Sequence, residues 1–139
     1  MAGRLGRARD SLMADKKLVL AVDDDASVCD LYEAGLPVLG YDVICASSAG
    51  KAREMLKKHR PDVILMDIMM SDQDGISLTR DLRSEDATAD IPVIIVSGLA
   101  DAATLDDALR FGAADYLVKP VDVSILKAKL ERALQLKKK

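Results

Sequence analysis

Five short apolar runs alternate with amphipathic segments from residue 18 onward, and this alternation constrains the fold more than any other feature. The runs are rich in Val, Ile and Leu and cover 18–22, 43–46, 63–66, 93–96 and 116–118. Strands that are buried on both faces of a parallel sheet have this continuous apolar character. The intervening segments place apolar residues at helical spacing. We expect an α/β fold with one doubly wound, five-stranded parallel sheet and five helices on its two faces.

Turn and capping residues stand at the boundaries of these elements. Gly40 can end the first helix in a left-handed conformation, Ser48 can cap the second helix and Asp122 can cap the last. Pro37 falls near the end of the first helix and removes a backbone donor, so we expect a kink or an early stop there.

Composition indicates a single globular domain. The 139 residues are 50% hydrophobic and carry 20 Lys plus Arg against 23 Asp plus Glu. We assign residues 16–139 to the domain and set residues 1–15 aside as a flexible leader or extension. Basic residues are concentrated at the two ends, so the body between them is acidic. An acidic body disfavours direct contact with nucleic acid or with an anionic membrane.

Cysteine usage and hydropathy favour a cytoplasmic protein. Cys29 and Cys45 are far apart in the sequence and have no metal-ligand spacing, so we expect reduced thiols. No apolar run approaches the ~18 residues that a membrane helix needs.

Acidic residues follow the first and third apolar runs. Asp23, Asp24 and Asp25 come directly after the first run, and Asp67 comes directly after the third. If the strand order is 2-1-3-4-5, these carboxylates meet at one edge of the sheet, where ligands bind in such folds. Uncompensated carboxylates repel one another, and a bound Mg²⁺ relieves that repulsion. Asp25 is the residue of this group that best fits a simple helix cap.

Two more polar groups follow the fourth and fifth runs. Ser97 precedes Gly98, which leaves a hydroxyl beside an unobstructed backbone amide, and Lys119 precedes Pro120. A metal, a hydroxyl and an ammonium group at one edge can share the oxygens of a phosphoryl group. We therefore predict a phosphoryl-binding site there.

These motifs together resemble the receiver domain of bacterial two-component response regulators. The resemblance rests on Val-Asp-Asp-Asp at 22–25, Asp67 with Asp74-Gly75 downstream, Ser97 after Val-Ile-Ile-Val, and Ala-Asp-Tyr-Leu-Val-Lys-Pro at 114–120. It covers residues 18–136 and implies a flavodoxin-like receiver fold.

The resemblance implies a phosphoacceptor and a metal site. Asp67 matches the side chain that takes a phosphoryl group from a phosphohistidine to form an aspartyl phosphate. Asp23 and Asp24 match the acidic pair that holds Mg²⁺, with Asp67 and the backbone carbonyl of Met69 as the other protein ligands.

The resemblance also implies residues that read the phosphoryl group. Ser97 matches the hydroxyl that turns toward it, and Lys119 matches the lysine that pairs with it. The bond between Lys119 and Pro120 is expected to be cis. Tyr116 matches the aromatic side chain that moves inward on activation, when the surface around the fourth and fifth helices changes.

The implied protein is a signalling switch and not a conventional enzyme, since it catalyses only its own phosphorylation and slow dephosphorylation. The implied donor is a sensor histidine kinase or a phosphotransfer protein, and the output is an effector protein or domain outside this chain. We expect a monomer or a weak, phosphorylation-dependent homodimer. The chain can be a stand-alone regulator or part of a larger regulator, kinase or cyclase.

Four residues depart from the commonest family pattern. Ser71 stands where proline is frequent, which predicts a more mobile loop after Asp67, and Val121 stands where phenylalanine is frequent. Met69 and Leu99 are apolar where some relatives have polar groups that orient water. We therefore hypothesise slow autodephosphorylation.

Three other functions are weighed against this interpretation, and the sequence disfavours the first two. A haloacid-dehalogenase-like phosphatase needs a second carboxylate at position 69, where this chain has Met69. An FMN carrier needs a Ser-, Thr- and Gly-rich loop after the first strand, where this chain has three aspartates. A phosphorylation-independent, receiver-like interaction module is the third alternative.

Overall fold

The computed structural model describes residues 16–138. The predicted leader, residues 1–15, lies outside the described residues. The elements in chain order are β1 (Leu18–Val22), α2 (Ala26–Val38), β2 (Asp42–Ala46), α3 (Ala49–Lys58), β3 (Val63–Met66), α4 (Gly75–Ser84), β4 (Val93–Ser97), α5 (Ala102–Arg110), β5 (Asp115–Val118) and α6 (Val123–Lys138). None of the described helices has the length and apolar character needed to cross a membrane.

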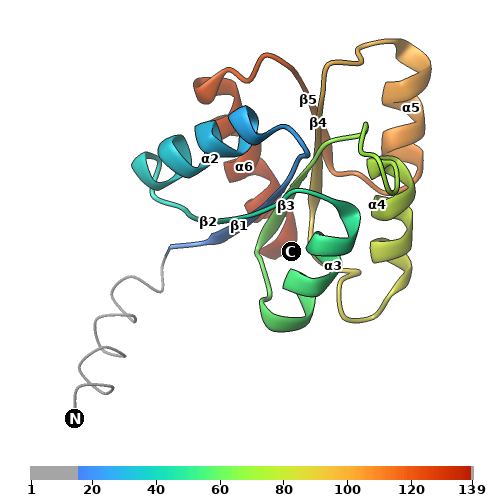
Figure 1. Cartoon of the computed structure of the whole chain (residues 1–139), viewed down its shortest axis with the longest axis horizontal. Helices are drawn as coiled ribbons and strands as arrows, with labels where there is room; N and C mark the ends of the chain where they lie inside the picture. Colours follow the sequence, from blue (N-terminus) through green and yellow to red (C-terminus); the bar gives the residue numbers. More distant parts are fainter. Residues whose placement is uncertain (1–15, 139) are drawn as a thin grey trace.

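The five strands form one parallel sheet in the order β2-β1-β3-β4-β5, as the sequence predicts. Helices α2 and α6 cover one face of this sheet, and α3, α4 and α5 cover the other (Figure 1). The chain therefore changes from one face to the other after β2 and again after β5, and its three middle helices share one face. Because all strands point the same way, the residues that follow them meet at one edge.

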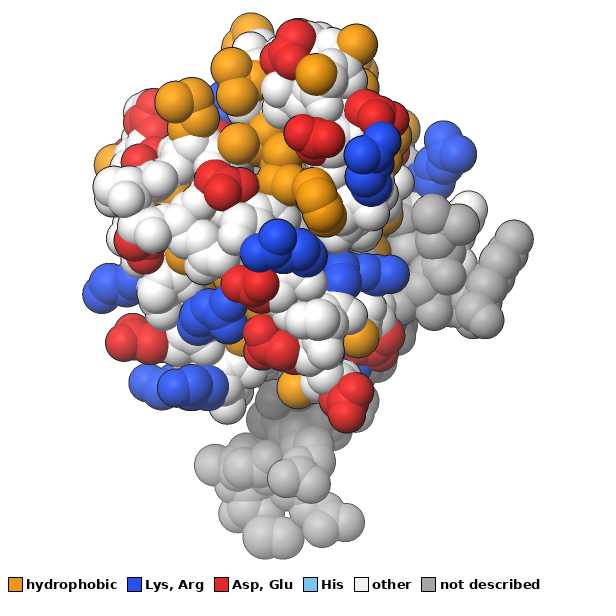
Figure 2. Space-filling view, turned by 90° about the vertical axis from the view of Figure 1, so that its right-hand side faces the viewer, with side chains coloured by type: hydrophobic (Ala, Val, Ile, Leu, Met, Phe, Trp, Pro, Cys, Tyr) orange, Lys and Arg blue, Asp and Glu red, His pale blue; other side chains and the backbone are white. Residues whose placement is uncertain are grey.

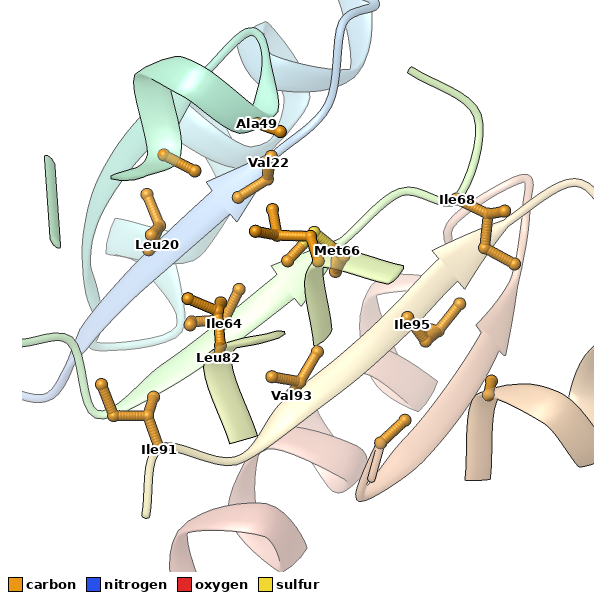
Figure 3. Packing of buried hydrophobic residues seen from close by; sticks show 14 of the residues in the cluster. Leu20, Val22, Ala49, Ile64, Met66, Ile68, Leu82, Ile91, Val93 and Ile95 are labelled. Carbon is orange, nitrogen blue, oxygen red and sulfur yellow. The ribbon is translucent and has the colours of Figure 1, made fainter. Parts of the chain in front are cut away.

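Side chains from alternate strand positions form two apolar layers. On the face covered by α3, α4 and α5, Leu20 of β1, Ile64 of β3 and Val93 of β4 lie side by side (Figure 3). On the other face, Val19 and Ala21 pack with residues of α2 and α6. Burying one Leu, Ile or Val side chain stabilises a fold by about 1.5–3 kcal/mol. The central strands are therefore a rigid base for the residues at their ends.

The predicted boundary residues occupy their expected places. Gly40 has a φ of 95° just after α2, in the left-handed region that favours glycine. The side chain of Ser48 accepts a hydrogen bond from the N–H of Lys51 at the start of α3. Asp122 accepts one from the N–H of Ser124 ahead of α6. Pro37 lies inside α2, one residue before the helix ends at Val38.

Candidate functional site

Polar residues from four strands converge at the carboxyl edge of the sheet. Asp23 follows β1, Asp67 follows β3, Ser97 ends β4 and Lys119 follows β5. Backbone bonds hold the two acids in place beyond the strands, since the N–H of Asp67 donates to the carbonyl of Val22 at 2.9 Å. The four residues line a pocket of about 260 Å³ together with Asp24, Asp25, Met69, Gly98 and Leu99.

Three carboxylates lie close together in this pocket. Oxygens of Asp23, Asp24 and Asp67 lie within 4.8 Å of one another. Asp23 and Asp67 are buried, with 1% and 6% of their surface exposed, whereas Asp24 is exposed. Oxygen-only donors at this separation fit a hard cation such as Mg²⁺, which keeps some of its water ligands. The residues present therefore suit the predicted metal.

Lys119 is the cation that faces these acids. Its Nζ lies 2.7 Å from Oδ2 of Asp23 and 3.6 Å from Oδ1 of Asp67. Burial alone lowers the pKa of a lysine, but the hydrogen bond and charge of Asp23 outweigh it and raise the pKa of Lys119 above its ordinary value. The ammonium group therefore stays charged at neutral pH. The Lys119–Pro120 bond is cis, as predicted.

One lysine does not neutralise the acids completely. The pKa of Asp67 is raised above its ordinary value, chiefly by burial and then by the charge of Asp23, although Lys119 opposes the shift. The site therefore holds more negative charge than the protein itself compensates. A cation at this edge relieves that excess.

Asp25 differs from the other acids of the pocket. Its carboxylate accepts hydrogen bonds from the N–H and the hydroxyl of Ser27 at 2.9 and 2.6 Å, and it caps α2. The side-chain bond from Ser27 is the main cause of its lowered pKa. The interpretation of Asp25 as a helix cap is confirmed.

Ser97 and Tyr116 both form hydrogen bonds with Leu99, in the loop that follows β4. The hydroxyl oxygen of Ser97, which is buried, accepts a hydrogen bond from the N–H of Leu99 at 3.2 Å. The hydroxyl of Tyr116 donates to the carbonyl of Leu99. Tyr116 is buried, with 6% of its surface exposed. Both side chains therefore hold the same short loop.

Gly75 has a role that sequence reasoning did not assign. A Cβ added at Gly75 would lie 1.9 Å from the backbone carbonyl oxygen of Asp67. The N–H of Gly75 also donates to the carbonyl of Ile68 at 2.8 Å. The glycine thus allows the start of α4 to lie against the backbone that carries Asp67. The Asp74-Gly75 pair was visible in the sequence, but nothing local showed what it touches.

The two cysteines, Cys29 in α2 and Cys45 in β2, are free thiols. The Sγ of Cys29 lies 3.4 Å from the carbonyl oxygen of Asp23, and the Sγ of Cys45 lies 3.8 Å from that of Cys29. Burial raises the pKa of both thiols, and that of Cys45 reaches about 12. Little thiolate therefore forms at neutral pH, so both thiols are poor nucleophiles.

The sequence matches a family model described as the response regulator receiver domain over residues 19–131. A probable transcriptional regulator ycf27 of Guillardia theta is 35% identical over 93% of this chain and 50% of its own length. The transcriptional regulatory protein ZraR of Escherichia coli K12 is 38% identical over 84% of this chain and 26% of its own length. The chain thus spans half or less of these curated relatives.

Solved structures show the same architecture. A CheY-like response regulator receiver domain protein from Methanospirillum hungatei JF-1 superimposes with a TM-score of 0.81 and 28% identity, over 88% of this chain and 97% of its own. The chemotaxis protein CheY4 of Vibrio cholerae has a TM-score of 0.81 and 28% identity, over 86% of this chain and 99% of its own. The likeness covers the whole sheet with its flanking helices.

Proposed function

We propose that this chain, which belongs to the family of response regulator receiver domains, is a phosphoacceptor switch in two-component signalling. The observation that carries the proposal is a buried acid, Asp67, between two further acids and one lysine at the carboxyl edge of the sheet. An arrangement of this kind suits phosphoryl transfer, which depends mainly on positioning and charge neutralisation.

The transfer step uses the carboxylate of Asp67 as the nucleophile. One of its oxygens forms a bond to phosphorus while the bond between phosphorus and an imidazole nitrogen of the donor histidine breaks. The electron pair of the broken bond stays on the imidazole, which takes up a proton. Lys119, already held 2.7 Å from Asp23, offers its positive charge to the transferred oxygens.

The metal ligands that we propose are Asp23, Asp24, Asp67 and the backbone carbonyl of Met69. The three carboxylates form the cluster described above, and Met69 lines the same pocket. Mg²⁺, when bound, neutralises charge on the carboxylates and on the phosphoryl oxygens. The protein residues set where the donor can approach Asp67.

The switch acts through the loop after β4. A phosphoryl group on Asp67 offers an acceptor for the hydroxyl of Ser97, which now accepts a hydrogen bond from Leu99. Tyr116 is tied to the carbonyl of the same Leu99, so both respond to one change. The loop leads into α5, whose Leu109 is 50% exposed, and hydrophobic side chains gather at the top of this side of the molecule (Figure 2). This surface is the proposed output surface.

The partners follow from the family and from the relatives. We propose a sensor histidine kinase or a phosphotransfer protein as the donor, and an effector protein or domain outside the present sequence as the recipient of the signal. The cytoplasm is the proposed location. The proposed form is a monomer or a weak homodimer that depends on phosphorylation.

The phosphorylated form is proposed to decay slowly. Met69 and Leu99 flank the pocket, are 65% and 38% exposed, and have no polar group that can orient a water molecule toward Asp67. The double variant Met69→Asn with Leu99→Glu supplies such groups and is expected to shorten the lifetime of the aspartyl phosphate. The lifetime is measured by intact mass after removal of the donor, and an unchanged lifetime overturns this point.

The test of the proposed function is phosphorylation by acetyl phosphate. With Mg²⁺ present, the protein is expected to gain the mass of one phosphoryl group, and Asp67→Asn is expected to gain none. Asp90→Asn, which removes an exposed acid near the opposite edge of the sheet, is the matched control and is expected to behave as the parent. If the parent protein gains no mass, the interaction module without phosphorylation takes the place of this proposal.

A further inference from the structure

We infer that Asp72 is a positioning residue, which tethers the loop between β3 and α4 to helix α3 and thereby holds the Met69 carbonyl where it can complete the metal site. The inference rests on the proposed function, because it concerns the Mg²⁺ site of Asp23, Asp24 and Asp67. Asp72 does not line the pocket, so it acts through the loop and not by contact with the ion.

The tether consists of two hydrogen bonds from the first turn of α3. The N–H of Ala49 donates to Oδ1 of Asp72 at 3.1 Å, and the N–H of Gly50 donates to Oδ2 at 3.0 Å. These bonds are the main reason that the pKa of Asp72 is lowered, with the bond from Gly50 first. One carboxylate thus joins Asp72 to Ala49 and Gly50, which precede it in the sequence by 23 and 22 positions.

The first turn of a helix leaves backbone N–H groups without partners inside the helix, and α3 satisfies them in two ways. Ser48 accepts from the N–H of Lys51 at 3.0 Å, as a local cap does. Asp72 accepts from the N–H groups of Ala49 and Gly50, which precede Lys51 in the helix. Ser48 and Asp72 therefore serve the same helix end, but only Asp72 belongs to the loop beside the site.

The loop is fixed at both of its ends. At the start, the N–H of Asp67 donates to the carbonyl of Val22 at 2.9 Å, and at the end the N–H of Gly75 donates to that of Ile68 at 2.8 Å. Between these points Met69 is 65% exposed, so burial of its side chain does not hold it, although Ile68 and Met70 on either side pack against the core. The tether of Asp72 restrains this middle part.

The residue that precedes Asp72 adds no restraint of its own. Ser71 is exposed, and its φ is not fixed by a ring as that of a proline would be. The backbone from Met69 to Asp72 is short enough that a fixed carboxylate at one end limits where the carbonyl at the other can go. Loss of the tether therefore enlarges the range of positions of the Met69 carbonyl.

The experiment measures Mg²⁺ binding by isothermal titration calorimetry in the absence of any phosphoryl donor. Four proteins are compared: the parent, Asp72→Ala, Asp72→Asn and Ser48→Ala. Asp72→Ala is expected to bind Mg²⁺ roughly tenfold more weakly, the lower end of what changes beyond the direct ligands cost. Asp72→Asn loses the same charge but keeps one carbonyl oxygen as an acceptor, so its affinity is expected to lie between those of Asp72→Ala and the parent. Ser48→Ala, which removes the other cap of α3, is expected to bind as the parent does.

A second readout separates positioning from chemistry. At saturating Mg²⁺, the rate of phosphorylation by acetyl phosphate is expected to be the same in Asp72→Ala and the parent, because only the affinity for the ion is changed. The amide NMR signals of residues 69–71 are expected to shift in Asp72→Ala without Mg²⁺, whereas those of β1 stay in place.

The outcomes separate this inference from the proposed function. If the parent protein does not bind Mg²⁺, the proposed function fails. If the parent binds and Asp72→Ala binds equally well, the inference fails alone. Equal weakening in Asp72→Ala and Asp72→Asn would assign the effect to charge, and equal weakening in Ser48→Ala would assign it to the stability of α3. Either result overturns the positioning role.

Discussion

The charged residues at the two edges of the sheet differ in their exposure to solvent. At the amino edge, Oδ2 of Asp62 accepts a hydrogen bond from the N–H of Leu18 at 2.8 Å. Close by, Arg60 and Asp90 form an ion pair at 2.6 Å in which both side chains are more than half exposed. At the carboxyl edge, Asp23 and Asp67 are buried beside each other with Lys119 as the cation that faces them.

The difference indicates that the carboxyl edge is the one built for chemistry. Solvent screens the charges of the amino edge, so their arrangement has little effect on the free energy of folding. The charges of the carboxyl edge are desolvated and repel one another, which costs stability until a ligand binds. Such a local conflict is typical of a functional site.

The largest effect is expected from Gly75→Ala. The new methyl group would lie 1.9 Å from the carbonyl oxygen of Asp67, and neither backbone can move without disturbing the carboxyl edge. We expect the free energy of unfolding to fall by about 3 kcal/mol, as measured by urea denaturation. Gly35→Ala is the control, since nothing lies within 4 Å of its added Cβ in α2, and it is expected to be neutral or stabilising. If Gly75→Ala changed the free energy of unfolding no more than Gly35→Ala does, the close approach would be contradicted.

The next effect is expected from Asp67→Asn without Mg²⁺. The carboxylate of Asp67 has a raised pKa in the folded state, so its ionised form is less favourable there than in the unfolded chain. Its ionisation therefore costs stability above the folded-state pKa, and that cost vanishes below the unfolded-state pKa. We expect Asp67→Asn to unfold at a higher urea concentration than the parent, with a free energy of unfolding greater by about 1.5 kcal/mol at pH 7.

The pH dependence of this variant sharpens the prediction. The advantage of Asp67→Asn over the parent is expected to shrink as the pH falls through the folded-state pKa of Asp67 toward its ordinary value. Added Mg²⁺ is expected to reverse the order at pH 7, because the ion stabilises the parent more than the variant. An advantage that does not change with pH would show that charge at the carboxyl edge is not its cause.

A smaller gain is expected from Tyr32→Phe. The hydroxyl of Tyr32 is buried in α2 and finds no hydrogen-bond partner among the described residues. Burial raises its pKa, and the charges of Asp23 and Asp67 add to that shift. Removal of the hydroxyl is expected to raise the free energy of unfolding by about 1 kcal/mol, the lower end of the cost of an unsatisfied buried group. Tyr41→Phe is the control, and a loss of stability in Tyr32→Phe would contradict the assignment.

The smallest effect is expected at the amino edge. Arg60 and Asp90 are 56% and 61% exposed, so their coupling in a double-mutant cycle with alanine is expected to be below about 0.5 kcal/mol. The same cycle for Lys119 and Asp23 is expected to give a larger coupling, since Asp23 is buried and Lys119 is only 23% exposed. Equal couplings at the two edges would remove the contrast between them.

The fold was predictable because its signals are local. Each strand is an apolar run, and caps such as Ser48 and Asp122 stand beside the helices that they begin. The strand order brings Asp23 and Asp67 together, so the acidic cluster was also predictable once the order was assumed. The cis bond at Lys119–Pro120 was implied by the resemblance and is present.

Other features depend on contacts between segments far apart in the sequence. The contact between Gly75 and the carbonyl of Asp67 depends on how α4 leaves the sheet. The bonds from Ala49 and Gly50 to Asp72 depend on how the loop after β3 meets the start of α3. No spacing or periodicity shows such contacts, because the residues involved are ordinary in their own segments.

The most direct test of the central claim is to locate the phosphoryl group. The protein is treated with acetyl phosphate and Mg²⁺, and borohydride then reduces the acyl phosphate to an alcohol, which converts the modified aspartate to homoserine. Peptide mass spectrometry is expected to find homoserine at position 67 and at no other aspartate. Homoserine at Asp23 or Asp24, or none in a protein that binds Mg²⁺, would contradict the assignment of Asp67 as the phosphoacceptor.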